Sequence, residues 1–169
     1  YENGLFSLQG EGFTCLLRVN EWGLLEQLYF GPKVDTGDFV AFQPDPGIGW
    51  GASVLLETGN NASCPDAMPL AWSGSGRGDY RESPLDLGVS TDFRYESHEI
   101  LETPVPMTGG LPSASGKGEQ LKITMTQKGL KLELYFGIFG GVLTRRTVLH
   151  NTGEAPITIS KCMSFLMDL

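Results

Sequence analysis

The chain has 169 residues, a formal net charge of −8 at neutral pH, 23 glycines and 10 prolines. This length suits a single domain with a sizeable core. The negative charge argues against nucleic acid and against an anionic membrane surface as partners, because both would repel it. No apolar run is long enough to predict a transmembrane helix, and the first residues do not predict a signal peptide.

Three cysteines, Cys15, Cys64 and Cys162, are widely spaced and odd in number. They form no C-x-x-C motif, and no histidine lies at metal-ligand spacing from them. This pattern predicts reduced structural thiols in the cytoplasm rather than a disulfide framework or a metal site. We therefore expect neither a metal nor another cofactor.

The first predicted strands occupy residues 5–8, 13–19 and 24–30. The last two flank the turn Asn20–Gly23 and predict a hairpin, with Trp22 at one end of the core. The hairpin should end at Gly31-Pro32, because proline has no backbone N–H to donate to a neighbouring strand.

Residues 35–71 show no periodic pattern and are dominated by Gly, Pro, Asn, Asp and Ser. A connection of this length in a compact domain is either functional or a lid over the scaffold. Trp50 lies within it, between two glycines, as an exposed binding aromatic or as a buried anchor of the loop. Large aromatic side chains are usually buried, which favours the anchor.

Strand patterns return after Pro84. Apolar and polar residues alternate most clearly over residues 121–126 and 130–136, as expected for strands with one buried and one polar face. We therefore predict an all-β fold, a large antiparallel β-sandwich with little helix, formed by residues 1–169 as one domain. The other strands predicted here, with a break at Gly137–Gly141, are residues 85–89, 93–101, 142–150 and 157–166.

The segment Leu70–Pro84 concentrates the most versatile side chains of the sequence. Trp72, Asp79, Tyr80 and Arg81 offer an indole, a carboxylate, a phenol and a guanidinium within ten residues. Neighbouring glycines let the backbone adapt to a ligand or partner. Such a planar, hydrogen-bonding set suits a hydroxylated ligand, and a solvated turn that carries charges by chance is the alternative.

The chain lacks the residue pairs of a self-sufficient hydrolytic site. Asp79 and Glu82 lie on one loop and cannot bracket a sugar ring from opposite faces, as glycosidase carboxyl groups do. His98 and His150 are distant in sequence and have no nucleophile motif beside them, so structural roles are favoured for both. We therefore predict no catalytic residue in this chain.

Arg145 and Arg146 are adjacent in a predicted strand, so their side chains should point to opposite faces. A buried arginine usually pairs with a carboxylate, and Asp168 is a candidate partner. A contact within an oligomer is the alternative role.

Several segments, in order along the chain, resemble the N-terminal β domain of the glycoside hydrolase family 36 α-galactosidases. Residues 24–31 (LLEQLYFG) are similar to the family strand that ends in Leu-Tyr-Tyr-Gly. Residues 76–81 (GRGDYR) are similar to its Gly-x-Gly-Asp-Tyr/Phe-Arg motif. The likeness covers nearly the whole chain except residues 36–70. The remaining similar segments, matching a Gly-Leu-Pro connector and the closing strands, are residues 110–112, 119–123, 134–146, 151–153 and 164–169.

The resemblance implies a β-supersandwich that precedes a catalytic (β/α)₈ barrel. The two catalytic aspartates would lie in that barrel, beyond residue 169, and the chain would be a fragment whose sequence starts at Tyr1 rather than at a methionine. It would be the accessory domain, inactive alone, of a retaining exo-α-galactosidase that acts on raffinose- or melibiose-type sugars, in a homo-oligomeric parent enzyme. A free-standing carbohydrate-binding or assembly module is the alternative.

Carried over residue by residue, the resemblance places Asp79, Tyr80 and Arg81 at the mouth of a galactose pocket as substrate-binding residues. Trp72 would provide a stacking surface for the sugar. A carboxylate and a guanidinium can hold neighbouring hydroxyls in bidentate fashion, and an indole offers a flat apolar face to a sugar ring.

Overall fold

The computed structural model describes residues 4–35, 54–60 and 63–167 of the chain. Within these ranges the regular structure consists of β-strands and one short 3₁₀ turn, η2 (Pro65–Ala67), which confirms the predicted all-β fold with little helix. No helix in these ranges has the length and apolarity needed to cross a bilayer. Trp50, the predicted loop anchor, and Asp168, the candidate arginine partner, lie outside the described residues.

The N-terminal sheet has three antiparallel strands in the order β1-β2-β3. Asn20 closes the turn between the last two, because its Oδ1 accepts hydrogen bonds from the backbone N–H groups of Trp22 (3.1 Å) and Leu24 (2.9 Å). The predicted hairpin is confirmed, and its second strand ends at Pro32, where the missing N–H stops the pairing. The strands are β1 (Leu5–Gln9), β2 (Phe13–Val19) and β3 (Leu25–Pro32).

A second sheet has four antiparallel strands and shows the predicted alternation. Ile123 and Met125 on one strand, and Leu132 and Leu134 on the next, are all 0% exposed on the face that meets the core. The strands, in their order across the sheet, are β5 (Arg94–Leu101), β6 (Glu119–Gln127), β7 (Leu130–Phe139) and β8 (Val142–Asn151).

The break predicted at Gly137–Gly141 is wrong for its first residues, because β7 continues to Phe139. Gly137 pairs with Thr144 on β8, and a Cβ at Gly137 would lie 2.5 Å from Thr144 Oγ1. The glycine therefore allows a close approach between two paired strands rather than ending one of them.

A third, two-stranded sheet pairs β4 (Leu85–Asp86) with β9 (Lys161–Cys162) in antiparallel register. Both strands are shorter than the predicted strands 85–89 and 157–166. Ile157 and Ile159, at the start of the predicted strand 157–166, are 37% and 49% exposed. These partly exposed residues precede β9 and are not paired with β4.

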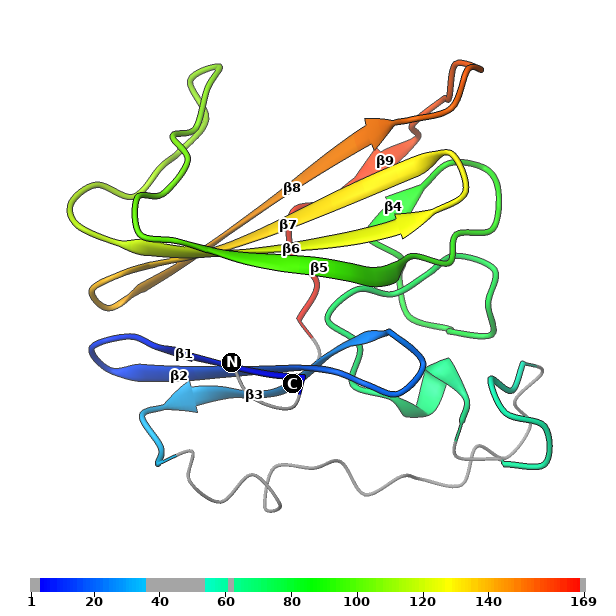
Figure 1. Ribbon diagram of the computed structural model, residues 1–169, viewed down its shortest axis with the longest axis horizontal. Helices are drawn as coiled ribbons and strands as arrows, with labels where there is room; N and C mark the ends of the chain where they lie inside the picture. The colour runs from blue at the N-terminus through cyan, green and yellow to red at the C-terminus, as the bar shows by residue number, and fades with distance from the viewer. Residues whose placement is uncertain (1–3, 36–53, 61–62, 168–169) are drawn as a thin grey trace.

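Figure 1 shows the N-terminal sheet facing the four-stranded sheet in two layers. The main hydrophobic core lies between them and includes Leu17 from β2, Leu25 from β3 and Leu134 from β7. A smaller cluster, against which Trp22 packs, consists of Leu24, Met68 and Leu70. The two layers and their core form the scaffold from which the loop around Asp79 extends.

The outer face of the four-stranded sheet carries a polar cluster around Glu133 on β7. Its carboxylate accepts a hydrogen bond from Tyr135 Oη (3.0 Å) and lies 3.1 Å from Lys131 Nζ and 3.0 Å from His150 Nε2. Burial raises the pKa of the Glu133 carboxyl, but the hydrogen bonds from His150, Lys131 and Tyr135 outweigh it and lower the pKa to about 2.

Because of the Glu133 cluster, the free energy of unfolding should decrease as the pH becomes acidic. Because the pKa falls from 4.5 to about 2 on folding, the ionised carboxyl stabilises the fold above pH 4.5 and this contribution is lost as the pH falls toward 2. Glu133→Gln should therefore be less stable than the wild type at about pH 6, with a difference that shrinks at about pH 3.

Urea denaturation followed by circular dichroism at the two pH values measures this difference in the free energy of unfolding. Glu102→Gln, at an exposed position after β5, is the matched control and should show no such trend. The prediction would be contradicted if Glu133→Gln lowered the free energy of unfolding by the same amount at both pH values.

Candidate functional site

The candidate site is the loop of residues 73–83, which leaves the core and returns to it at β4. A Cβ at Gly74 would lie 2.4 Å from the carbonyl oxygen of Thr91, and Gly78 has a φ of 75°, in the left-handed region that favours glycine. Ser75 N–H donates to Thr91 Oγ1 (2.8 Å), and Thr91 N–H donates to the Ser75 carbonyl oxygen (2.9 Å). The loop is therefore tied to the segment before β5.

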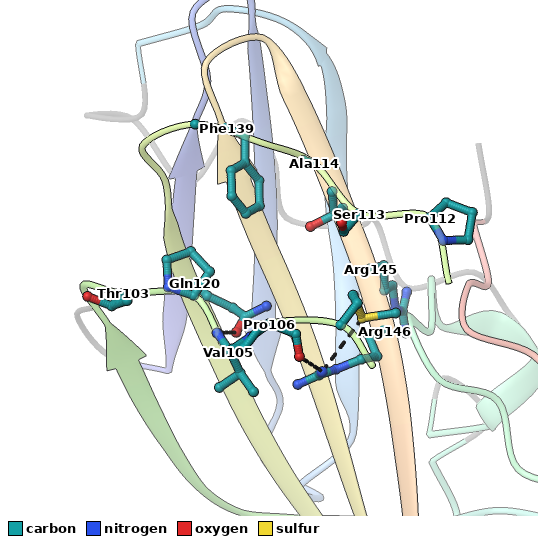
Figure 2. Close-up of a pocket in the computed structure, with 14 residues that line it drawn as sticks. Thr103, Val105, Pro106, Pro112, Ser113, Ala114, Gln120, Phe139, Arg145 and Arg146 are labelled. Carbon is teal, nitrogen blue, oxygen red and sulfur yellow. Dashed lines mark hydrogen bonds between the residues drawn. The ribbon is translucent and has the colours of Figure 1, made fainter. Parts of the chain in front are cut away.

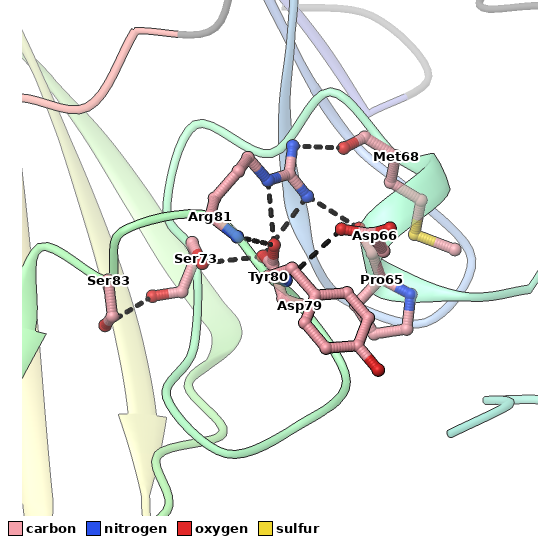
Figure 3. A network of polar contacts seen from close by, with 8 residues as sticks. All are labelled: Pro65, Asp66, Met68, Ser73, Asp79, Tyr80, Arg81 and Ser83. Carbon is pink, nitrogen blue, oxygen red and sulfur yellow. Dashed lines mark hydrogen bonds and ion pairs between the residues drawn. The ribbon is translucent and has the colours of Figure 1, made fainter. Parts of the chain in front are cut away.

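Asp79 lies at the centre of a polar network inside this loop (Figure 3). Its Oδ1 accepts hydrogen bonds from Arg81 Nε (2.9 Å) and from the Arg81 backbone N–H (3.1 Å). Its Oδ2 accepts from Ser73 Oγ (2.6 Å). The side chain of Asp79 is 0% exposed and that of Arg81 is 18% exposed. With donors on both oxygens, this buried carboxylate fixes the conformation of the loop.

Arg81 connects the loop to η2. Its Nη1 donates to the carbonyl oxygen of Met68 (2.5 Å), and its Nη2 donates to that of Pro65 (2.6 Å). These two carbonyls belong to the first residue and the C-cap of the 3₁₀ turn. Both charged groups of the Asp79–Arg81 pair thus bind atoms of the chain itself, and their predicted contact with a sugar stays a prediction.

Tyr80 projects outward between these two residues. The residue is 73% exposed, and its backbone N–H donates to Asp66 Oδ1 (3.2 Å). Figure 3 shows the phenol ring turned away from the Asp79–Arg81 pair. A phenol on a fixed loop offers a flat apolar face and a hydroxyl to a ligand, and its predicted substrate contact likewise stays a prediction.

Trp72 lies in the main core and is 2% exposed. The segment before it runs along β3, because the Ala71 N–H donates to the Leu25 carbonyl oxygen (2.9 Å) and Leu70 forms a β-bridge with Glu26. This path carries the indole inward. At 2% exposure the indole presents no open face in this domain, and its predicted role as a stacking surface stays a prediction.

Arg145 reaches from β8 to the base of the loop. Its Nη2 donates to the carbonyl oxygen of Ala71 (2.8 Å), and its Nη1 donates to that of Leu166 (3.1 Å). The guanidinium carbon lies 4.7 Å from the centroid of the Phe136 ring, and burial lowers the pKa of Arg145 to about 10. In the described residues, carbonyl oxygens and an aromatic face thus take the place of the predicted carboxylate partner.

The two histidines make contacts that suit structural roles. His98 Nδ1 lies 2.8 Å from Tyr95 Oη, and its ring centroid lies 4.9 Å from that of Phe6 on β1. His150 contacts Glu133 on the outer face of the four-stranded sheet. Within the described ranges, no group of three or more His, Cys, Asp or Glu side chains could hold a metal ion.

Residues 23–169 match the model of the glycosyl hydrolase family 36 N-terminal domain. The chain belongs to this family. The matched range includes the loop of residues 73–83 and the whole four-stranded sheet, and it confirms the predicted family resemblance.

Two curated relatives of this family 36 N-terminal domain are similar over nearly its whole length. The bifunctional alpha-galactosidase/sucrose kinase AgaSK of Mediterraneibacter gnavus is 27% identical over 177 residues, which cover 97% of the chain and 19% of the relative. Alpha-galactosidase Mel36A of Lactobacillus acidophilus is 28% identical over 181 residues, which cover 99% of the chain and 24% of the relative. The chain thus spans about a fifth to a quarter of the length of these relatives.

Solved structures show the same fold. The galactosidase domain of AgaSK superposes with a TM-score of 0.80 at 27% identity, covering 96% of this chain and 24% of that chain. The alpha-galactosidase from Lactobacillus brevis gives 0.81 at 20% identity, with 98% and 24% covered. A variant of AgaA from Geobacillus stearothermophilus, solved in complex with raffinose, gives 0.80 at 21% identity, with 95% and 24% covered.

In this family 36 N-terminal domain, the sequence predicts the loop of residues 73–83. It does not predict which residues fix the conformation of that loop. Met68 and Pro65 bind Arg81 through backbone carbonyls, which no side-chain pattern indicates. One signal was available: Asp79 and Arg81 are two residues apart, a spacing that places both side chains on one side of an extended segment. That spacing could have predicted their ion pair.

Proposed function

We propose that this chain is the N-terminal accessory domain of a retaining exo-α-galactosidase. The observation that carries the proposal is the family match over residues 23–169, together with relatives named as alpha-galactosidases over the same region. A catalytic (β/α)₈ barrel then follows residue 169 and holds the two catalytic aspartates. Its substrates are raffinose- or melibiose-type galactosides, a proposal supported by the raffinose complex of the similarly folded AgaA variant.

The geometry of the candidate site supports an accessory role. A retaining glycosidase needs two carboxyl groups about 5 Å apart that flank the bond to be cleaved. Here the Asp79 carboxylate is enclosed by Arg81 and Ser73, and Glu82 pairs with Lys161 at the surface. Neither carboxyl group is placed to work with the other on a sugar.

We place the loop at the mouth of the galactose pocket that the barrel forms. Asp79 and Arg81 hold the loop in one conformation, and Tyr80 presents its ring and hydroxyl to the substrate. A contact residue on a fixed loop loses little conformational freedom when it binds, which favours productive orientation of the sugar.

The parent enzyme in this proposal is a cytoplasmic homo-oligomer. Cys15, Cys64 and Cys162 are free thiols, which suits a reducing compartment. Ile159 and Met163 are 49% and 42% exposed near β9 and provide apolar surface for contact with the barrel or with a second subunit.

Hydrolysis of p-nitrophenyl-α-galactoside tests the proposed function. The full-length protein should release p-nitrophenol, whereas the purified 169-residue chain should release none, because the catalytic carboxyl groups lie elsewhere. Turnover by the isolated chain would overturn the proposal. A full-length protein that binds galactosides without cleaving them would favour the carbohydrate-binding module instead.

Tyr80→Ala in the full-length protein should lower kcat/KM about five- to tenfold. A lost aromatic contact or hydrogen bond is worth about 1–1.4 kcal/mol, and 1.4 kcal/mol corresponds to a factor of ten. Steady-state kinetics on raffinose measures the effect, and Tyr80→Phe separates the ring from the hydroxyl. Val89→Ala, at a position that is 62% exposed, is the control. Equal values of kcat/KM for Tyr80→Ala and for this control would show that Tyr80 does not contact the substrate.

A further inference from the structure

A pocket of about 330 Å³ lies on the four-stranded sheet and shares no residue with the loop of residues 73–83 (Figure 2). Gln120 on β6, Phe139 on β7 and Arg146 on β8 line it from the sheet, and the segment 103–116 between β5 and β6 lines it from the other side. This volume falls within the range of small-molecule sites. The role proposed for the chain leaves this pocket unused.

Arg145 and Arg146 both line this pocket, and Arg146 is the one whose guanidinium contacts the covering segment 103–116. Adjacent strand residues point to opposite faces, so Arg145 turns toward the loop base while Arg146 lies over the Tyr135 ring, 4.2 Å from its centroid. The contacts of Arg146 Nη1 are long and neutral, 3.4 Å to the Pro106 carbonyl oxygen and 3.6 Å to Met107 Sδ. No ion pair joins Arg146 to a carboxylate in the part of the chain that the structure describes.

Neutral donors accompany this guanidinium. The Gln120 side chain is fixed, because its Oε1 accepts a hydrogen bond from the Val105 N–H (3.1 Å), which leaves Nε2 as a donor group. Ser113 on the covering segment adds a hydroxyl. A carboxylate or a phosphate has several acceptor oxygens and requires such a set of donors around one cation.

The described residues that line the pocket include no acidic side chain, although the chain has 20 acidic residues and a net charge of −8. A neutral sugar donates its hydroxyl protons, and carboxylates are the strongest acceptors for them. This pocket offers a cation and donors instead, and its walls include the apolar Pro106, Met107, Pro112 and Phe139. The lining favours an anion with an apolar body over a neutral sugar.

We propose that this pocket binds a small organic anion, with a carboxylate or a phosphate at Arg146 and an apolar body against Phe139 and the segment 103–116. An arginine fork matches either anion in bidentate fashion. Binding of the anion is measured directly, so the test does not depend on galactoside turnover.

Titration calorimetry on the full-length protein with benzoate, phenyl phosphate and benzyl alcohol tests the proposal. Both anions should bind with a Kd of about 1 mM or below, and the neutral alcohol should bind at least about tenfold more weakly. The tighter of the two anions identifies the group that Arg146 prefers. Inorganic phosphate, which has no apolar body, should bind more weakly than phenyl phosphate.

Arg146→Gln should weaken binding of the preferred anion about tenfold or more, and Arg146→Lys should restore part of the affinity. Arg77→Gln removes the same charge at a residue that is paired with Asp92 and should leave anion binding unchanged. Ser113→Trp, at an exposed position of the covering segment, fills the pocket without disturbing the core and should abolish binding even if Arg146→Gln fails to fold.

Equal anion affinity in the wild type and in Ser113→Trp or Arg146→Gln would overturn the proposal, as would the absence of binding by both anions. Preference for benzyl alcohol over benzoate would also overturn it, because the guanidinium would then contribute nothing.

Discussion

Asp79→Ala is expected to lower the free energy of unfolding by about 3–5 kcal/mol, because it leaves the Arg81 guanidinium without its buried counter-charge. The Asp79 carboxylate is 0% exposed and binds Arg81 and Ser73, so both donors lose this acceptor when it is removed. Chemical denaturation followed by circular dichroism gives the difference.

Glu82→Ala is the matched control for this carboxylate. Glu82 lies three residues away, its side chain is 77% exposed, and it pairs with Lys161 at the surface. Exposed pairs contribute about 0–1 kcal/mol, so this change should cost far less than Asp79→Ala. Equal effects of the two substitutions would show that the Asp79–Arg81 pair does not hold the loop.

Trp72→Ala should lower the free energy of unfolding by about 3–5 kcal/mol, the usual cost of removing a buried aromatic side chain. The indole is 2% exposed and belongs to the main core. Circular dichroism rather than tryptophan fluorescence should follow the unfolding, since the substitution removes a fluorophore.

Tyr80→Ala provides the comparison for Trp72→Ala, because both remove a large aromatic from the same region. Tyr80 is 73% exposed, so removal of its side chain should change stability by about 0.5 kcal/mol or less. Trp72→Ala therefore tests the packing of the core, and Tyr80→Ala tests contact with the substrate. If Trp72→Ala lowered the galactosidase activity of the full-length protein but left the free energy of unfolding unchanged, Trp72 would be a substrate contact rather than a core residue.

The two central strands of the four-stranded sheet could be predicted from sequence because they alternate apolar and polar residues. Residues 121–126 and 130–136 place their apolar side chains on one face, and that face lies against the core. The extent of β9 could not be predicted in this way. Ile157 and Ile159 alternate as a strand would, but in the described chain they lie exposed, and pairing needs a neighbour as well as a pattern.

The sequence predicts which segment forms the candidate site. It does not predict which side chains of that segment are buried or what they bind. Trp72 stands among glycines and serines, a context typical of exposed loops, and its burial arises from the packing of Leu70 and Ala71 along β3, which lies more than 40 residues earlier. Similarly, Arg81 finds its acceptors in the carbonyls of a 3₁₀ turn. Long-range contacts of this kind leave no local pattern in the sequence.

Arg145 links two segments that lie far apart in the sequence. Its single guanidinium binds both the Ala71 carbonyl, where the loop departs from the core, and the Leu166 carbonyl, in the segment after β9. Neither segment can shift without stretching a bond to the same cation. A displacement of the chain at Leu166 would therefore strain the same cation that holds Ala71, so Arg145 couples the segment after β9 to the root of the loop that carries Tyr80.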